Sequence, residues 1–253
     1  MNKELYEEFH KNTKMTRKIA KDNNFDLINH LPIYKKYITP NDKVLDIGCG
    51  AAPMSLYFAS KGMNVKGVDL SKRAIEANQK AKEYFKFDNL EFVCENFMDY
   101  ADNAVYDVVM MTEVLEHIPD DKGSLEKINK FLKKGGYLLM SVPSSNAPLH
   151  KKYIKKYGKD PFDERVGHLR RYNAVEIFNL LSVTGFELVE FKLCEGYLRN
   201  WLYNDKVGQF FMKFNRFFIK NIVTFIDDKF FTPIFGESDI IIVARNKSIE
   251  KDK

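Results

Sequence analysis

The order of apolar runs along the chain limits its fold more than any other feature of the sequence. From Lys43 to Thr184, short apolar runs alternate with longer amphipathic segments. The apolar runs are residues 43–48, 64–69, 90–94, 106–112 and 136–142. The helical segments between them are residues 53–60, 71–86 and 120–133. Because the runs show no strict apolar–polar alternation, they fit strands buried on both faces, and the pattern predicts a parallel sheet with helices on both sides.

The C-terminal part of the sequence extends this sheet. A polar loop over 143–172 precedes a helix at 173–184 and a strand at 186–193, and a last strand follows at 238–245. We predict a single domain over 1–253, because nothing in the sequence marks a second core. Its predicted parts are N-terminal helices at 1–40, an α/β core at 41–196 and 237–247, and a helical insertion at 197–236.

Composition and charge exclude several classes of protein. A chain of 253 residues can bury a large core. Its net charge of +5 is modest and its lysines are scattered, so we expect no nucleic-acid partner. Cys49, Cys94 and Cys194 form no CxxC pair, which argues against a disulfide framework and indicates a reducing, cytoplasmic location. The N-terminus lacks the apolar stretch of a signal peptide.

A glycine-containing turn follows the first apolar run. Gly48 and Gly50 allow the backbone to turn sharply and to approach a ligand without a Cβ in the way. Asp69 ends the second run, 21 residues after Gly48, where its carboxylate can accept both hydroxyls of a ribose. The third glycine of the dinucleotide motif is replaced by Pro53, and Asp46 lies inside the turn. These two departures disfavour a pyrophosphate-binding site.

The motifs as a series resemble a known family. VLDIGCG, GVDLS, FVCENF, YDVVMMTEVLEHI and LKKGGYLLMSVP follow one another over residues 40–145. This series resembles the motifs of class I S-adenosylmethionine-dependent methyltransferases. The resemblance implies an α/β, Rossmann-like fold with a seven-stranded sheet in the order 3-2-1-4-5-7-6 and an antiparallel last strand. Helices would cover both faces, and the helical insertion would precede the last strand.

The resemblance also implies which residues bind the cofactor, S-adenosylmethionine. Asp46 would orient the turn, and Gly48 and Gly50 would admit the methionine portion. Asp69 would hold the ribose. Where the family usually has an Asp for the adenine amino group, this chain has Asn96, whose carbonyl oxygen can still accept that hydrogen bond. The full expected set is Asp46, Gly48, Cys49, Gly50, Asp69, Leu70, Asn96, Phe97, Thr112 and Glu113.

A cluster of acidic residues and histidine follows the fourth run. If this segment is helical, Glu113, Glu116 and His117 share one face. Together with His168 they could hold Mg²⁺ or Mn²⁺, and the ubiquinone-biosynthesis O-methyltransferases and small-RNA 3′-end methyltransferases show a similar ExxEH motif with a later histidine. Our prediction is a site without metal, with His117 and His168 as catalytic residues. His117 would line the pocket, and His168 would be the general base, because its unperturbed pKa near ~6.5 suits proton removal from a hydroxyl.

The insertion at 197–236 is rich in phenylalanine, and the sequence predicts a long helix over 206–228. Polar side chains recur at helical spacing at Lys206, Gln209, Lys213, Arg216, Lys220 and Thr224. The apolar positions are Phe210, Phe211, Phe214, Phe217, Phe218, Ile222, Val223 and Ile226. Because this apolar face is wide, we predict a helical cap over the substrate mouth with its aromatic face inward. Peripheral membrane contact through 206–228 and a homodimer contact are the alternatives.

The predicted activity is methyl transfer from S-adenosylmethionine to an oxygen of a small or lipid-like acceptor. Catalysis would depend mainly on proximity and in-line alignment, with a base or metal needed only where the acceptor loses a proton. The alternative within enzymes is N-methylation of an amino sugar or another small amine. The alternative from another class is a non-catalytic module that binds S-adenosylmethionine.

Overall fold

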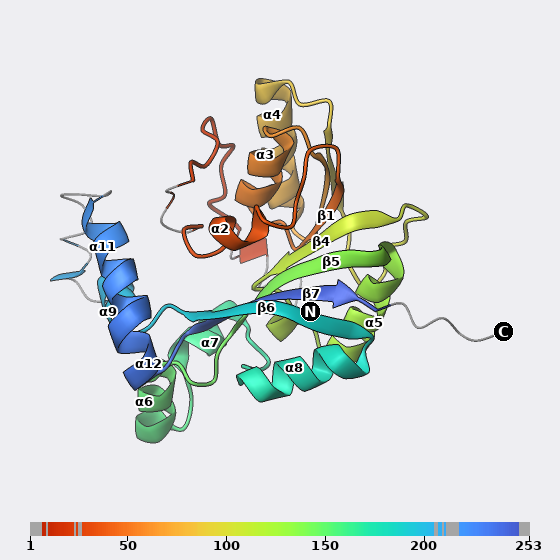
Figure 1. Cartoon of the computed structure of the whole chain (residues 1–253). Helices are drawn as coiled ribbons and strands as arrows, with labels where there is room; N and C mark the ends of the chain where they lie inside the picture. The colour runs from red at the N-terminus through yellow and green to blue at the C-terminus, as the bar shows by residue number, and fades with distance from the viewer. Residues whose placement is uncertain are drawn as a thin grey trace.

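The computed structural model describes residues 7, 8, 10–22, 24, 27–204, 207, 208, 210 and 218–247. One sheet of seven strands has the order β3-β2-β1-β4-β5-β7-β6 (Figure 1). The strands are β1 (Lys43–Ile47), β2 (Asn64–Asp69), β3 (Leu90–Cys94), β4 (Tyr106–Thr112), β5 (Leu132–Pro143), β6 (Phe186–Cys194) and β7 (Asp239–Asn246). Strands β1 to β5 are parallel, and β7 runs antiparallel to both β5 and β6. The predicted fold class, strand order and antiparallel last strand are confirmed.

Helices cover both faces of the sheet, as the alternating pattern predicts. The helices α2 (Leu31–Tyr34), α3 (Pro53–Ala59) and α4 (Lys72–Phe85) contribute to the core on one face. On the opposite face lie α5 (Asp121–Phe131) and α8 (Ala174–Val183). Capping side chains fix where these helices begin: Ser71 accepts from the Ala74 amide before α4, and Asn173 forms a capping box before α8.

Residues 143–172, predicted as a polar loop, contain two helices. These are α6 (Pro148–Tyr157) and α7 (Pro161–Val166). Each begins with a proline in its first turn and ends at a left-handed glycine, Gly158 or Gly167, the usual termination signals of a helix. Neither helix has a buried residue, so the sequence carries no apolar periodicity from which a helix could be predicted.

The predicted N-terminal helices are wrong for most of the described residues between 10 and 40. Between residues 10 and 40, the described chain contains α2 and otherwise turns. Local side-chain hydrogen bonds explain part of this difference, because Thr16 bonds to the backbone of Lys18 and so competes with helix formation. The segment instead lies across the glycine-containing turn, where a Cβ on Gly50 would be 3.5 Å from the His10 ring.

The insertion is helical, but its faces differ from the prediction. It contains α9 (Tyr197–Asn204), α11 (Phe218–Ile226), a π-helical turn at Asp227–Phe231 and α12 (Thr232–Phe235). Thr224, expected on the outer polar stripe, is buried, while Phe210 and Ile222, expected to face inward, are 57% and 40% exposed. The physical reason is Arg199: this buried guanidinium donates to Thr224 Oγ1 at 3.3 Å, so the helix turns its threonine inward.

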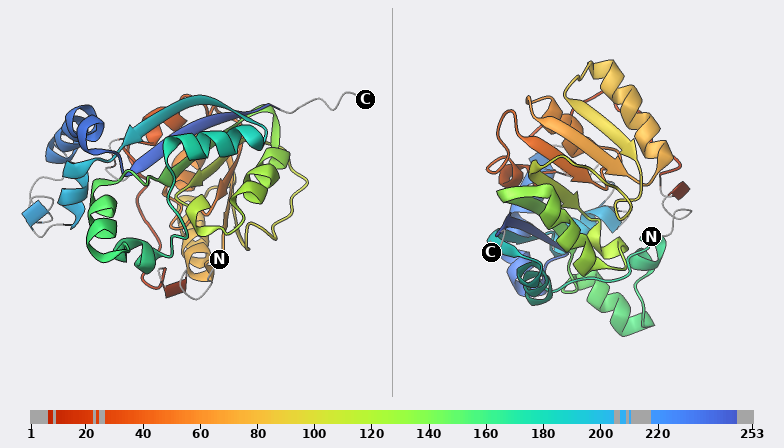
Figure 2. Two further views of the ribbon diagram at one scale, coloured as in Figure 1. Left: turned by 90° about the horizontal axis from the view of Figure 1, so that it is seen from below. Right: turned by 90° about the vertical axis from the view of Figure 1, so that its right-hand side faces the viewer.

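The remaining expectations for the 206–228 helix concern residues that are not described. Outside the described residues lie Lys206, Gln209, Phe211, Lys213, Phe214, Arg216 and Phe217, together with the side chains of Phe218 and Lys220. The insertion packs beside α6 at one end of the sheet, as two perpendicular views show (Figures 1 and 2). Within the described part of the chain, no helix combines the length and apolar character needed to cross a membrane.

Candidate active site

The glycine-containing turn after β1 requires glycine at position 48. Gly48 has φ +67° and Gly50 has φ +51°, both in the left-handed region. A Cβ on Gly48 would lie 2.4 Å from Cγ2 of Val114, which is closer than any real contact between these atoms. The turn therefore passes tightly beneath the segment after β4, and only a residue without a side chain fits there.

Two carboxylates hold this turn and its neighbour together. Asp69, at the end of β2, accepts hydrogen bonds at 2.8 Å from the backbone N–H groups of Gly50 and Ser71. Asp46 is buried and accepts from the Ser55 hydroxyl. Burial raises the pKa of Asp46 to about 7, against the opposing effect of the Ser55 bond and with a further contribution from the Asp69 carboxylate. The structure thus brings Asp46, Gly48, Gly50 and Asp69 together at one edge.

The other expected cofactor residues lie in different surroundings. Cys49 is buried, and Phe97 is buried in the core, where its ring centroid is 6.4 Å from that of Phe131. The Asn96 side-chain carbonyl oxygen accepts a hydrogen bond from the Met98 amide at 3.1 Å. Part of its capacity to accept a hydrogen bond from the adenine amino group is therefore already used. Thr112 Oγ1 lies 3.3 Å from the Tyr34 hydroxyl at the end of β4. Leu70 is half-buried beside Asp69.

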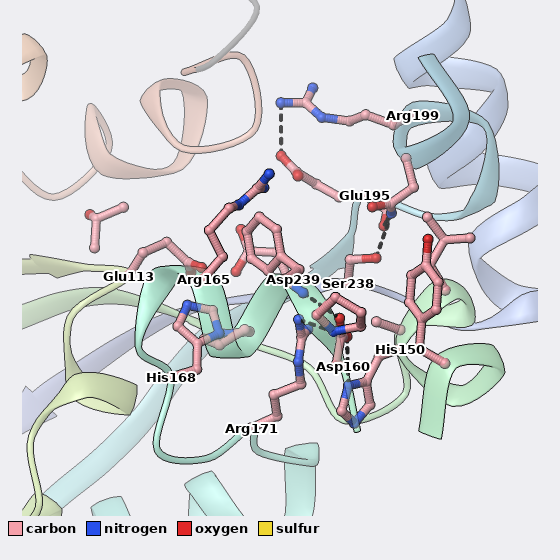
Figure 3. Close-up of a pocket in the computed structure, with 18 of the residues that line it drawn as sticks. Glu113, His150, Asp160, Arg165, His168, Arg171, Glu195, Arg199, Ser238 and Asp239 are labelled. Atoms are coloured by element: carbon pink, nitrogen blue, oxygen red, sulfur yellow. Dashed lines mark hydrogen bonds and ion pairs between the residues drawn. The ribbon is translucent and has the colours of Figure 1, made fainter. Parts of the chain in front are cut away.

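A cavity of about 680 Å³ lies next to this edge (Figure 3). Its walls come from the carboxyl ends of β4, β5 and β6, the start of β7, helices α6 and α7, and the first residues of α9. The lining side chains that carry a charge or titrate are His30, Glu113, His150, Asp160, Arg165, His168, Arg171, Glu195, Arg199 and Asp239. In open α/β sheets, the carboxyl ends of the strands are where ligands bind.

Two histidines and a buried glutamate converge beside this cavity. His117 Nδ1 lies 3.1 Å from the Gly167 carbonyl oxygen, and His168 Nδ1 lies 2.9 Å from Asp163 Oδ1. Both Nε2 atoms face Glu116 Oε1, at 3.6 Å from His117 and 3.8 Å from His168. Glu116 is fully buried, and neither of its carboxylate oxygens has a hydrogen-bond partner among the described residues.

Burial and neighbouring charges shape the titration of this group. Burial, with His168 close by, lowers the pKa of His117 to about 4. Burial and then the Glu113 carboxylate raise the pKa of Glu116 well above its usual range. Burial opposes the ionised form of Asp163, but hydrogen bonds from His168 and Arg171 still hold its pKa below the usual range.

Glu113 does not join the four-residue set that is the alternative to a site without metal. Its backbone has φ +55°, and the segment after it is a single 3₁₀ turn at Leu115–His117 rather than an α-helix. Glu113 therefore leaves the face shared by Glu116 and His117, and its carboxylate accepts from the Ser141 hydroxyl at 2.8 Å. Among the residues described, the group that converges on one point here is Glu116, His117 and His168.

An internal ion-pair network fixes the wall built by α6 and α7. Arg171 donates to both oxygens of Asp163, at 2.7 Å from Nη2 and 2.9 Å from Nε. His150 Nδ1 lies 3.0 Å from Asp160 Oδ2. Because Arg171 is committed to Asp163, it supports the wall and the orientation of His168.

Several cavity residues were not predicted from the sequence. They are His30, Glu195, Arg199 and Asp239. Asp239 begins the buried strand β7 and Glu195 follows β6, and a charged residue at a strand end is a usable signal for a site at a sheet edge. His30 and Arg199 carry no such signal, because they reach the cavity only through the packing of α2 and α9.

With β7 inserted antiparallel between β5 and β6, the sheet is that of a class I methyltransferase rather than of a dinucleotide-binding dehydrogenase. The residue pattern of the methyltransferase domain family matches residues 13–191. The chain therefore belongs to the methyltransferase domain family. The resemblance seen in the motif series is confirmed.

Individual relatives and solved structures show how far the similarity extends. The chain is 36% identical to the ubiquinone biosynthesis O-methyltransferase of Idiomarina loihiensis over 107 residues, which are 41% of this chain and 43% of that protein. A putative sarcosine dimethylglycine methyltransferase from Galdieria sulphuraria superposes with a TM-score of 0.64 at 13% identity, covering 89% of this chain and 86% of the other. The N-methyltransferase NodS from Bradyrhizobium japonicum, solved with S-adenosylhomocysteine, gives 0.58 at 16% identity, covering 96% and 98%. These two structures share the fold.

Proposed function

We propose that this chain transfers a methyl group from S-adenosylmethionine to an oxygen of a small or lipid-like acceptor bound in the cavity. The observation that carries the proposal is the position of His168. Its imidazole lines the cavity together with Thr112 and Glu113 at the end of β4. The ubiquinone biosynthesis O-methyltransferases that match part of the chain support oxygen as the acceptor atom. N-methylation of a small amine is the alternative, for which no base is required.

The cofactor would lie along the edge formed by the Gly48 turn, Asp69 and the end of β4. Gly48 and Gly50 bring the backbone close to the methionine portion, and Asp69 accepts the ribose hydroxyls. Thr112 and Glu113 belong to both the cofactor edge and the cavity, so they mark where the methyl group would meet the acceptor. Cys49, Leu70, Asn96 and Phe97 complete the proposed set.

His168 would act as the general base for the acceptor hydroxyl. The carboxylate of Asp163 can only accept a hydrogen bond, so His168 Nδ1 carries the proton in this contact and Nε2 is the basic atom. Asp163 in turn is held by Arg171, which fixes the orientation of the imidazole. The arrangement is that of a base whose tautomer is set by a neighbouring acid. His117 would line the adjoining wall.

The test of this function is methyl transfer itself. S-adenosylmethionine carrying a ¹³C methyl group is incubated with cell extract and the protein, and the product is identified by mass spectrometry and by the ¹³C shift of its methyl group. We expect a methyl ether, and we expect His168→Gln to lower the rate by about 10²–10⁴-fold at unchanged affinity for S-adenosylhomocysteine. If the product is a methylamine and His168→Gln forms it at the full rate, the activity is N-methylation and the proposal of O-methylation is contradicted.

A second candidate is a metal-assisted form of the same reaction, and the structure offers a fit for a cation. The Gly167 carbonyl and the Asp163 carboxylate are pure acceptors, so both imidazoles donate through Nδ1 and direct an Nε2 lone pair toward Glu116. Glu116 adds two oxygens without hydrogen-bond partners among the described residues. Two nitrogens and a carboxylate suit Mn²⁺ better than Mg²⁺. A bound cation there would acidify an acceptor hydroxyl.

Metal binding can be measured without the acceptor. We expect metal-free protein to bind Mn²⁺ at one site by electron paramagnetic resonance, with the affinity lowered about 10–100-fold by Asp163→Asn, which loosens the orientation of His168. Glu116→Gln should remove binding, whereas Glu113→Gln, whose side chain lies outside the converging group, should retain it. Absence of Mn²⁺ binding by the wild-type protein, together with full turnover in EDTA, would leave His168 acting as a base alone.

The helical cap and its surface contacts complete the proposal. Arg199 and Asn200 of α9 line the cavity, which supports a cap that bounds the substrate mouth. Phe225 and Phe230 are 61% and 53% exposed, and Lys229 lies over both rings. These exposed rings support a contact with a membrane surface or a second copy rather than an aromatic face turned inward.

A further inference from the structure

Three carboxylates line the floor of the cavity, each at the end of a different strand. Glu113 follows the last residue of β4, Glu195 follows the last residue of β6, and Asp239 is the first residue of β7. In the sheet, Asp239 pairs with Pro143 of β5 and with Cys194 of β6. This register places Asp239 between the other two acids, as Figure 3 shows.

Buried polar atoms without partners distinguish this floor from an ordinary acidic surface. Asp239 is 6% exposed, and its Oδ1 has no hydrogen-bond partner among the described residues. His30, 5% exposed, also lines the cavity, and the same holds for both of its ring nitrogens. Its Nε2 lies 3.5 Å from Asp239 Oδ2. A buried polar atom without a partner costs free energy, which a bound donor would recover.

Backbone strain occurs at two of the same residues. Glu113 has φ +55° and Glu195 has φ +62°, although neither is a glycine. Strain of this kind persists only where the surrounding structure imposes it, and it gathers at ligand sites. In both residues the left-handed conformation directly follows a strand, so the acidic side chain leaves the direction of the strand at the cavity wall.

Three carboxylates line the floor, and among the described lysines and arginines only Arg199 lies within ion-pair distance of one of them. Arg199 Nη2 pairs with Glu195 at 2.8 Å, and no described carboxylate lies within ion-pair distance of Arg165 on the opposite wall. Burial, then Arg199 and Lys192, lower the pKa of His30 to about 3, so its imidazole is neutral. Burial, then Glu113 and Glu195, raise the pKa of Asp239 well above its usual range. A cationic ligand would reverse this effect on Asp239.

We infer that Asp239, Glu113, Glu195 and neutral His30 form a subsite for an ammonium group on the acceptor. A primary ammonium carries three N–H donors and no acceptor, which matches the three carboxylates and the one unprotonated ring nitrogen of neutral His30. The three carboxylates are not among the described groups whose ligand atoms lie within 4.8 Å of one another, so as they stand they do not close around one metal ion. The inference rests on the proposed function, because it defines the acceptor as a hydroxyl compound that also bears an amino group.

Two probes that differ only in the charged group test the inference. Tyramine and 4-ethylphenol share the phenol ring and hydroxyl, and only tyramine carries an ammonium. Their affinities are measured by ligand-observed NMR on the full chain saturated with S-adenosylhomocysteine. We expect tyramine to bind about tenfold or more tightly than 4-ethylphenol, as charge-assisted hydrogen bonds imply. Equal affinities, or no binding of tyramine, would overturn the inference.

Substitutions at the floor test whether the preference for tyramine over 4-ethylphenol arises there. Asp239→Asn should reduce the ratio of the two affinities to within roughly threefold. Glu164→Gln, at an exposed carboxylate of α7, is the matched control and should keep the wild-type ratio. If Asp239→Asn does not fold, Glu195→Gln provides the same test at a partly exposed side chain. If the ratio of the two affinities keeps its wild-type value in both Asp239→Asn and Glu195→Gln, the ammonium group binds elsewhere and the inference is contradicted.

The cofactor itself carries an ammonium group, so its affinity is measured in parallel. Asp239→Asn should leave the affinity for S-adenosylhomocysteine unchanged. A variant that loses this affinity and keeps the tyramine preference would assign the floor to the cofactor and overturn the inference. Failure of the wild-type protein to bind S-adenosylhomocysteine would instead contradict the proposed cofactor site, which keeps the two outcomes separate.

Discussion

Gly48→Ala is expected to lower the free energy of unfolding by about 2–4 kcal/mol and to abolish binding of S-adenosylhomocysteine. Two effects add at this position. The alanine would have to adopt φ +67°, and its Cβ would lie 2.4 Å from Val114 Cγ2. Relief of that clash requires the turn to move away from the segment after β4, and the same turn is the proposed contact with the methionine portion. Chemical denaturation and calorimetry measure the two effects.

Gly135→Ala is the matched control for this variant. Gly135 has φ +75°, close to that of Gly48, but a Cβ there would meet nothing within 4 Å. This variant therefore carries the backbone penalty alone, about 1 kcal/mol, and should bind S-adenosylhomocysteine like the wild type. Equal losses of stability in the two variants would show that the contact with Val114 does not constrain the turn.

Asp227→Ala is expected to destabilise the insertion by about 2–4 kcal/mol. The Asp227 carboxylate is fully buried and accepts from the amides of Leu198 at 2.9 Å and Arg199 at 3.0 Å. It therefore caps the first turn of α9 from the π-helical turn across the insertion. Without it, two buried N–H groups lose their acceptor, and α9 loses its attachment beside the cavity.

Hydrogen exchange locates this effect. The amides of Leu198 and Arg199 should exchange faster in Asp227→Ala, and those of the β1–β4 core should not. Asp227→Asn, which keeps one acceptor oxygen, should recover part of the protection. Affinity for S-adenosylhomocysteine should be unchanged in both variants. Exchange that increases uniformly over the sheet would show that the insertion and the core unfold as one unit, against a local effect of Asp227 on the insertion.

The sheet could be predicted because its strands are buried on both faces. In β1 and β4, most residues are apolar and buried, and the glycine or acid that follows marks the strand end, so the apolar pattern and the motif agree. Helices α6 and α7 show the opposite case. Their side chains all remain accessible, so nothing in the apolar pattern distinguishes them from a loop, and only Pro148, Pro161 and the glycines indicate their ends.

The candidate site could be predicted only where its residues follow strands directly. Asp69 and Glu113 lie at strand ends, and the strand order brings them to one edge. The approach of Glu116 to His168 depends on a 3₁₀ turn and on Asp163, which spacing does not reveal. The face of α11 depends on the burial of Arg199, which a helical wheel drawn for the helix alone cannot include.

Calorimetric titration with S-adenosylhomocysteine tests the central claim most directly. The wild-type protein should bind one equivalent. Asp69→Ala should weaken binding by about a hundredfold or more, because two charge-assisted hydrogen bonds to the ribose are lost. Asp88→Ala, which removes an exposed carboxylate shortly before β3, should bind normally. Wild-type protein that does not bind S-adenosylhomocysteine, or a folded Asp69→Ala variant with unchanged affinity, would contradict a cofactor site at the Gly48 turn and Asp69.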